Sequence, residues 1–103
     1  DVESVKWYRI AADQGSSKAQ LNLGNRYKKG EGVEKNDEEA VRWYRLSAEQ
    51  GNAGAQCNLG LCYHYGQGVA KNVEEAVKWY RLAANQGNAV AQKFLRKLCP
   101  PTL

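Results

Sequence analysis

The chain has 103 residues, which suffices for one small domain and is too short for two ordinary hydrophobic cores. Its hydrophobic fraction of 43% is ordinary for a globular protein, and no apolar run approaches the ~20 residues that a membrane span needs. The net charge of +4 conceals an uneven distribution along the chain.

Six helices are predicted in chain order, and the side chains that begin them recur. Ser16, Asn52 and Asn88 stand where the second, fourth and sixth helices need an N-cap. Asn36 and Asn72 do the same for the third and fifth helices, and a glutamate three residues later resembles a capping box. No strand pattern competes with these helices. The predicted helices cover residues 3–14, 17–29, 38–50, 53–65, 74–86 and 89–98.

A Trp-Tyr-Arg triplet recurs every 36 residues, beginning at Trp7, Trp43 and Trp79. Residues 1–36 and 37–72 agree at 20 of 36 positions. A fixed period between about 20 and 50 residues is typical of solenoid proteins, which stack similar units. In each unit we call the helix with the triplet helix B and the helix after it helix A. The sequence therefore predicts an all-α solenoid of six helices in antiparallel pairs.

The period divides the chain into one domain of complete and partial units. Near its C-terminal end, Arg96 replaces the glycines found at Gly24 and Gly60, and Pro100 prevents the helix from continuing. A bulky arginine at a close-packing position predicts a terminal cap. The predicted units of domain 1–103 are helix B of a partial repeat (1–15), two repeats (16–51 and 52–87) and a terminal helix A with its tail (88–103).

The first predicted helix, residues 3–14, repeats an interior helix B nearly unchanged. A solenoid unit buries its apolar face only against its neighbours, so a helix A upstream of this helix is expected to be missing. We therefore expect Trp7 and Tyr8 to be partly uncovered. Weak self-association through these two side chains is expected to follow.

The run of residues 40–63 resembles the Sel-one-like repeat, a relative of the tetratricopeptide repeat, and so does the Tyr-x-x-Gly-x-Gly-Val turn at 27–33 and 63–69. The resemblance implies a right-handed α-α superhelix that serves as an adaptor in multiprotein assemblies. Some bacterial members pair cysteines within each repeat, and a few of those are associated with penicillin binding or β-lactamase activity. This chain lacks a cysteine pair in every repeat, so it departs from that branch.

Recurring small residues on each helix A predict close helix packing. Ala19 and Gly24 are small, while Leu23 and Tyr27 on the same face are large enough to fill the space between helices. A tryptophan could bury ~150–250 Å² in such a core. A structural role is therefore predicted for the tryptophans, and base stacking is the alternative.

The helix A segments (16–30, 52–66 and 88–99) contain seven basic residues and no acidic residue, whereas the remainder contains eight basic and eleven acidic residues, a net charge of −3. Such a segregation of charge bears on partners and association, and it predicts an acidic protein or peptide partner. The basic residues of the helix A segments are Lys18, Arg26, Lys28, Lys29, Lys93, Arg96 and Lys97.

The side of helix A opposite the packed face is predicted to form a groove for the partner, because the resemblance places these helices on the concave side. Asparagine amides can bind the backbone of an extended peptide, and lysines attract carboxylates. An RNA-binding helical repeat is the alternative, but the groove positions differ in every repeat and the middle helix A lacks Lys and Arg. The predicted groove residues are Lys18, Asn22, Asn25, Lys29, Asn58, Leu61, Tyr65, Lys93, Phe94 and Lys97.

Catalysis is not predicted. The only histidine, His64, lies seven residues after Cys57 on one helix, and two turns separate their backbones by ~10.5 Å, too far for a nucleophile–base pair. One histidine and scattered cysteines are too few for a metal site, and no cofactor is expected. The three cysteines are expected to be reduced and buried, which favours the cytoplasm without defining the compartment.

Overall fold

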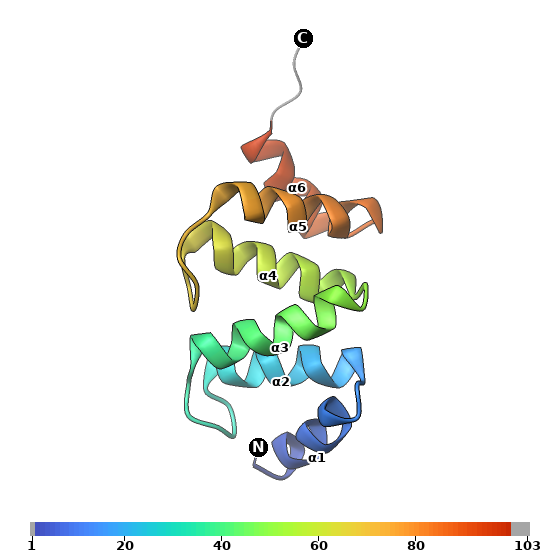
Figure 1. Ribbon diagram of the computed structural model, residues 1–103, viewed down its shortest axis with the longest axis vertical. Helices are drawn as coiled ribbons and strands as arrows, with labels where there is room; N and C mark the ends of the chain where they lie inside the picture. Colours follow the sequence, from blue (N-terminus) through green and yellow to red (C-terminus); the bar gives the residue numbers. More distant parts are fainter. Residues whose placement is uncertain (1, 100–103) are drawn as a thin grey trace.

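The computed structural model describes residues 2–99, and Figure 1 shows their helices stacked one after another along a single axis. Each boundary lies within one residue of the predicted one, and residues 2–99 contain no strand. Residue 1 and residues 100–103, which include the predicted proline stop, lie outside the described part. The helices are α1 (Val2–Asp13), α2 (Ser17–Lys29), α3 (Asp37–Glu49), α4 (Ala53–Tyr65), α5 (Val73–Asn85) and α6 (Ala89–Leu98).

Local capping explains why these boundaries could be predicted. The Asn36 side chain accepts a hydrogen bond from the backbone N–H of Glu39 at 3.1 Å, as an N-cap does. The second bond of a capping box is absent from the described residues: the Glu39 carboxylate accepts from Arg42 at 3.1 Å instead. The Asn36 N–H has no need of it, because it donates to the Tyr27 carbonyl at 3.0 Å. At the C-terminal end of α2, Gly30 adopts the left-handed backbone conformation (φ 71°) that ends the helix.

Glycine lets α2 approach α3, and the same contact recurs between α4 and α5. A Cβ atom on Gly24 would lie 2.7 Å from two ring carbons of Tyr44, and one on Gly60 would lie 2.7 Å from the same atoms of Tyr80. Both tyrosines are buried. The prediction that small residues serve close packing is therefore confirmed, and Arg96, at the equivalent position of α6, is exposed.

The tryptophans pack against the preceding unit. Trp43 is 3% exposed and lies in a cluster with Val5 and Leu23, while Trp79 is 6% exposed in the next cluster along the axis. Trp7 is 63% exposed because no described helix precedes α1 to cover it. The structural role is thus confirmed for two tryptophans, and the expected exposure of Trp7 is observed. Tyr8 beside it is half-buried.

Candidate partner-binding surface

Two asparagines of the predicted groove meet between α2 and α4. The Asn25 side-chain oxygen accepts hydrogen bonds from the Tyr44 hydroxyl at 2.7 Å and from the Asn58 amide at 3.3 Å. Both asparagines are half-buried. The carbonyl of Asn25 is therefore engaged within the protein, whereas its amide nitrogen and the Asn58 carbonyl have no hydrogen-bond partner among residues 2–99.

An open cavity of about 460 Å³ lies between α1 and α2 and contains the first two residues of the predicted groove, Lys18 and Asn22. Its other wall includes Trp7 and Tyr8, which were expected from the sequence to be partly uncovered and to mediate self-association rather than to line the groove. An aromatic wall thus faces an amide and an ammonium group, a composition that suits a peptide segment with both apolar and acidic side chains.

An aromatic cluster joins the C-terminal ends of α4 and α6. His64 stacks on Tyr65 with ring centres 4.4 Å apart, and it meets Phe94 edge-on at 5.8 Å. His64 Nδ1 lies 3.1 Å from the hydroxyl of buried Tyr80, and the Lys97 ammonium lies 5.7 Å from the Phe94 ring centre. Three predicted groove residues are therefore gathered here, but the sequence missed His64. Its repeat-equivalent residue is Lys28, so repetition gave no signal for an aromatic contact.

The remaining groove residues differ in how far they face outward. Leu61 and Phe94 are half-buried and pack against the hydrophobic cluster formed by α4, α5 and α6, so their predicted outward orientation is only partly right. The exposed Lys29 and Lys93 make no hydrogen bond or ion pair within residues 2–99. The structure thus brings together an amide pair and an aromatic cluster, and among residues 2–99 neither lysine makes a hydrogen bond, ion pair or ring contact with them.

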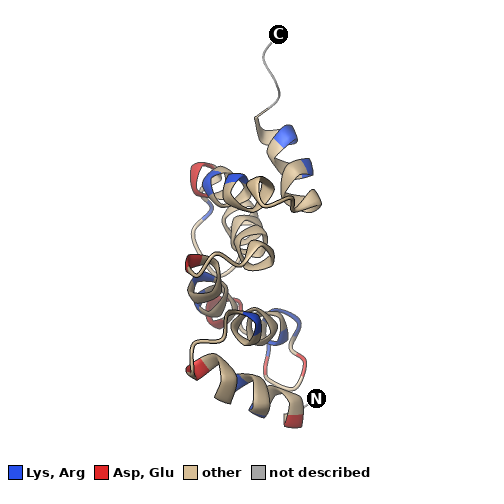
Figure 2. Ribbon diagram, turned by 90° about the vertical axis from the view of Figure 1, so that its right-hand side faces the viewer, with Lys and Arg blue, Asp and Glu red and all other residues tan. Residues whose placement is uncertain are grey.

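Ion pairs reduce the number of available cations on the A helices from seven to five. Arg26 pairs with Glu31 at 3.1 Å and lies over the Tyr8 ring at 5.5 Å. Lys28 lies 4.0 Å from the Asp37 carboxylate. Figure 2 shows α6 carrying basic positions without an acidic one. The cations that have no carboxylate partner among residues 2–99 are Lys18, Lys29, Lys93, Arg96 and Lys97.

The cysteines offer little chemistry. Cys57 and Cys62 are buried, and burial raises the pKa of each thiol, which disfavours the reactive thiolate. Cys99 is exposed, so the expectation of burial is wrong for this residue, which follows the last helix rather than lying within it. Residues 2–99 contain no group of three or more His, Cys, Asp or Glu that could hold a metal ion. None of the described helices combines the length and apolar character that crossing a bilayer requires.

Stacked helix pairs with buried repeat-equivalent tryptophans and an exposed polar face define an α-solenoid repeat protein. The family model of the Sel1 repeat matches residues 1–16, 17–52 and 53–88, so the chain belongs to the Sel1 repeat family. The predicted superhelical fold is confirmed. Proteins of this family generally act as protein-interaction modules, and their solenoids are typically scaffolds without enzymatic activity.

Solved structures show the same fold. A protective antigen of uropathogenic Escherichia coli is 40% identical, with a TM-score of 0.93 over 94% of this chain and 21% of its own. A Sel1 repeat protein from Oxalobacter formigenes is 43% identical, with a TM-score of 0.85 over 93% of this chain and 39% of its own. Cysteine-rich protein B of Helicobacter pylori is 26% identical, with a TM-score of 0.83 over 88% and 68%. No curated protein matches the sequence. The chain thus spans a minor part of the first two structures.

Proposed function

We propose that this chain is a protein-interaction module that binds an acidic protein or peptide segment on the face formed by α2, α4 and α6. The observation that carries the proposal is the segregation of charge. The helix A segments hold seven basic residues and no acidic one, and five of the seven cations have no carboxylate partner among residues 2–99. Charge segregated in this way attracts and orients a partner of opposite sign.

Each part of the face contributes a different contact. The exposed lysines attract carboxylates, and the amide nitrogen of Asn25 and the side-chain carbonyl of Asn58 can bind the peptide backbone between those carboxylates. The aromatic cluster around His64 and Tyr65 offers apolar contact at one end, and the cavity beside Trp7 offers it at the other. Because these contacts are shallow and partly exposed, we expect an affinity of about micromolar or weaker.

We infer binding rather than catalysis for the same surface. A nucleophilic thiol needs a thiolate, and burial keeps Cys57 and Cys62 in the thiol form. The ring of His64 contacts Tyr65, Tyr80 and Phe94, so its neighbours are aromatic rather than nucleophilic. His64 Nδ1 lies 3.1 Å from the Tyr80 hydroxyl, but Tyr80 is fully buried and burial raises the pKa of its phenol, which disfavours the nucleophilic phenolate.

Charge reversal tests the proposed face. We expect the double variant Lys29→Glu, Lys97→Glu to bind a fluorescein-labelled peptide of alternating Asp and Ser about tenfold more weakly than the wild type, because two attractions become repulsions. Binding should also weaken with added salt, since the Debye length is about 10 Å at 0.1 M. Fluorescence anisotropy across a salt series measures both effects.

The matched control reverses Lys35 and Lys71, which lie in the loops after α2 and α4 and change the net charge equally. Its affinity for the same peptide should stay within about twofold of the wild type, because neither lysine belongs to α2, α4 or α6. Equal losses in the two double variants would mean that net charge alone attracts the peptide, and would remove the assignment to α2, α4 and α6.

We also propose weak self-association through the exposed aromatic edge of α1. Trp7 is 63% exposed and Ile10 is 45% exposed on the same helix, so a second copy could cover them. Sedimentation over a hundredfold concentration range should show a rising average mass that Trp7→Ala suppresses. A constant monomer mass would contradict this proposal.

A further inference from the structure

The B helices α1 and α3 each hold a tyrosine of the following helix with an arginine. Arg9 donates a hydrogen bond from Nη2 to the Tyr27 hydroxyl, and its guanidinium carbon lies 5.6 Å from the ring centre. Arg45 does the same with Tyr63, at 5.5 Å. A guanidinium that both donates to the phenol oxygen and lies over the ring recognises tyrosine by two contacts at once. The pairing therefore recurs as part of the unit.

The third unit has the arginine without the tyrosine. Arg81 is the equivalent of Arg45, but Cys99 stands where Tyr27 and Tyr63 stand in the earlier units. The helix is also shorter: α6 ends at Leu98, whereas the earlier A helices continue beyond their tyrosines. Arg81 is consequently exposed, and it forms no hydrogen bond, ion pair or cation–π contact within residues 2–99.

A neighbouring apolar position is uncovered as well. Val5 and Val41 are each 5% exposed, because the turn after the next helix packs onto their clusters through Val33 and Val69. Their equivalent, Val77, is only half-buried. The first two units therefore fill this place with a tyrosine near the end of helix A and a valine from the turn after it, whereas nothing equivalent fills it in the third unit within residues 2–99.

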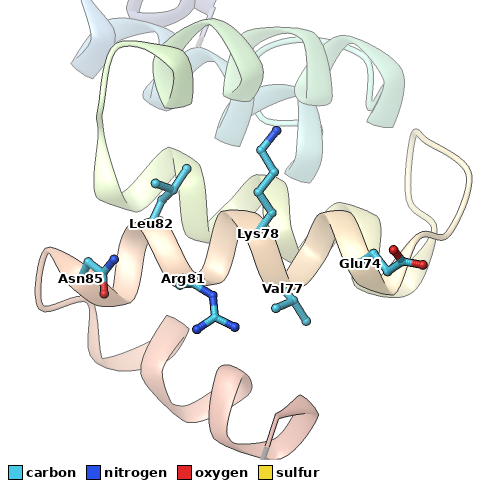
Figure 3. A pocket seen from close by; sticks show the side chains of 6 residues that line it. All are labelled: Glu74, Val77, Lys78, Arg81, Leu82 and Asn85. Atoms are coloured by element: carbon cyan, nitrogen blue, oxygen red, sulfur yellow. The ribbon is translucent and has the colours of Figure 1, made fainter.

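The unfilled place is an open depression of about 430 Å³ on α5. In Figure 3, Val77 and Arg81 project to the same side of α5, towards α6, while Lys78 and Leu82 project to the other. Lys78 is already engaged, since its ammonium lies 5.2 Å from the ring centre of Trp79. The lining residues are Glu74, Val77, Lys78, Arg81, Leu82 and Asn85.

We propose that this depression is a second docking site, which binds a tyrosine-bearing turn segment of a partner protein. The partner's phenol accepts a hydrogen bond from Arg81 and lies against its guanidinium, and an apolar side chain a few residues later covers Val77. The site continues the interface that this chain forms twice internally, with the same arginine and valine. It lies on α5 and is independent of the acidic partner proposed for the A helices.

A peptide of this chain provides the probe. Residues 24–35 contain Tyr27 and Val33 in their natural spacing and no cysteine, and they fill the equivalent place on α1. Titrated into the isotope-labelled full chain, this peptide should shift the backbone amide resonances of Val77 and Arg81. Arg81→Ala should weaken binding about tenfold or more, and a peptide with Tyr27→Phe should bind several-fold more weakly, because each removes one partner of the hydrogen bond.

Arg45→Ala is the matched control. It makes the same substitution at the equivalent position of α3, where Arg45 already donates its hydrogen bond to Tyr63 of the same chain. The peptide should bind this variant within about twofold of the wild type. The variant Lys29→Glu, Lys97→Glu should also retain peptide binding, which separates this proposal from the one for the A helices. Circular dichroism confirms that each variant is folded before titration.

Several results would overturn the proposal. Equal affinity of the peptide for the wild type and Arg81→Ala would show that the arginine is not the anchor. Binding that requires deletion of residues 100–103 would show that the chain's own C-terminal segment is the occupant. Self-association that Arg81→Ala abolishes would assign the site to a second copy of this chain.

Discussion

Replacing Trp43 with alanine should lower the free energy of unfolding by about 3–5 kcal/mol, whereas the same change at Trp7 should cost less than about 1 kcal/mol. Trp43 is 3% exposed and fills a cluster with Val5 and Leu23, so its removal leaves a cavity between two units. Trp7 is 63% exposed, and its truncation returns little surface to water. Urea unfolding followed by circular dichroism gives both values.

The comparison is well matched because the two residues occupy the same position of consecutive units and differ only in what lies before them. The indole nitrogen of Trp43 makes no hydrogen bond among the described residues, so truncation leaves no polar group without its hydrogen-bond partner. The expected loss at Trp43 is therefore the loss of packing, together with the contact of the Arg42 guanidinium, which lies 4.9 Å from the indole ring centre. Similar costs at Trp43 and Trp7 would mean that the surface of α1 is covered in solution, as a second copy would cover it, and would contradict the prediction that Trp7 contributes little to stability.

Replacing Gly60 with alanine should destabilise the protein by about 1–3 kcal/mol, although alanine is favoured over glycine within a helix by about 1 kcal/mol. The added Cβ would lie 2.7 Å from two ring carbons of Tyr80. That ring cannot easily move, because it is fully buried. Its hydroxyl oxygen lies 3.1 Å from His64 Nδ1, and it stacks on the Phe94 ring with the ring centres 5.6 Å apart. Steric conflict should therefore outweigh the gain in helix propensity.

Gly54→Ala provides the control on the same helix. Its Cβ would approach only the end of the Leu21 side chain at 3.2 Å and the capping oxygen of Asn52 at 3.3 Å. A leucine methyl group can shift by a few tenths of an ångström, so the change in stability should be within about 0.5 kcal/mol of zero. Thermal and urea unfolding of both variants decides the matter: a stabilised Gly60→Ala protein would show that α4 and α5 can separate at little cost.

The fold was more predictable than the surface because its signals are local. Asn36 and Gly30 act on backbone groups within a few residues, so sequence order alone places the ends of the helices. The groove residues were predicted from helical periodicity, which gives the direction in which a side chain points but not the contacts it makes. Asn25 thus proved to be held by Tyr44, and His64, which no repeated position suggested, proved to lie within the aromatic cluster.

The sequence by itself determined the helices, their 36-residue repetition and the segregation of basic residues to the A helices. Only the tertiary structure decided which basic side chains are held by a partner within the protein. Arg9 and Arg81 are identical in their triplets, yet the first is held by Tyr27 and the second is exposed. Tyr27 lies 18 residues after Arg9 on another helix. Whether such an arginine finds a hydrogen-bond partner therefore depends on packing between helices rather than on its neighbours in the chain.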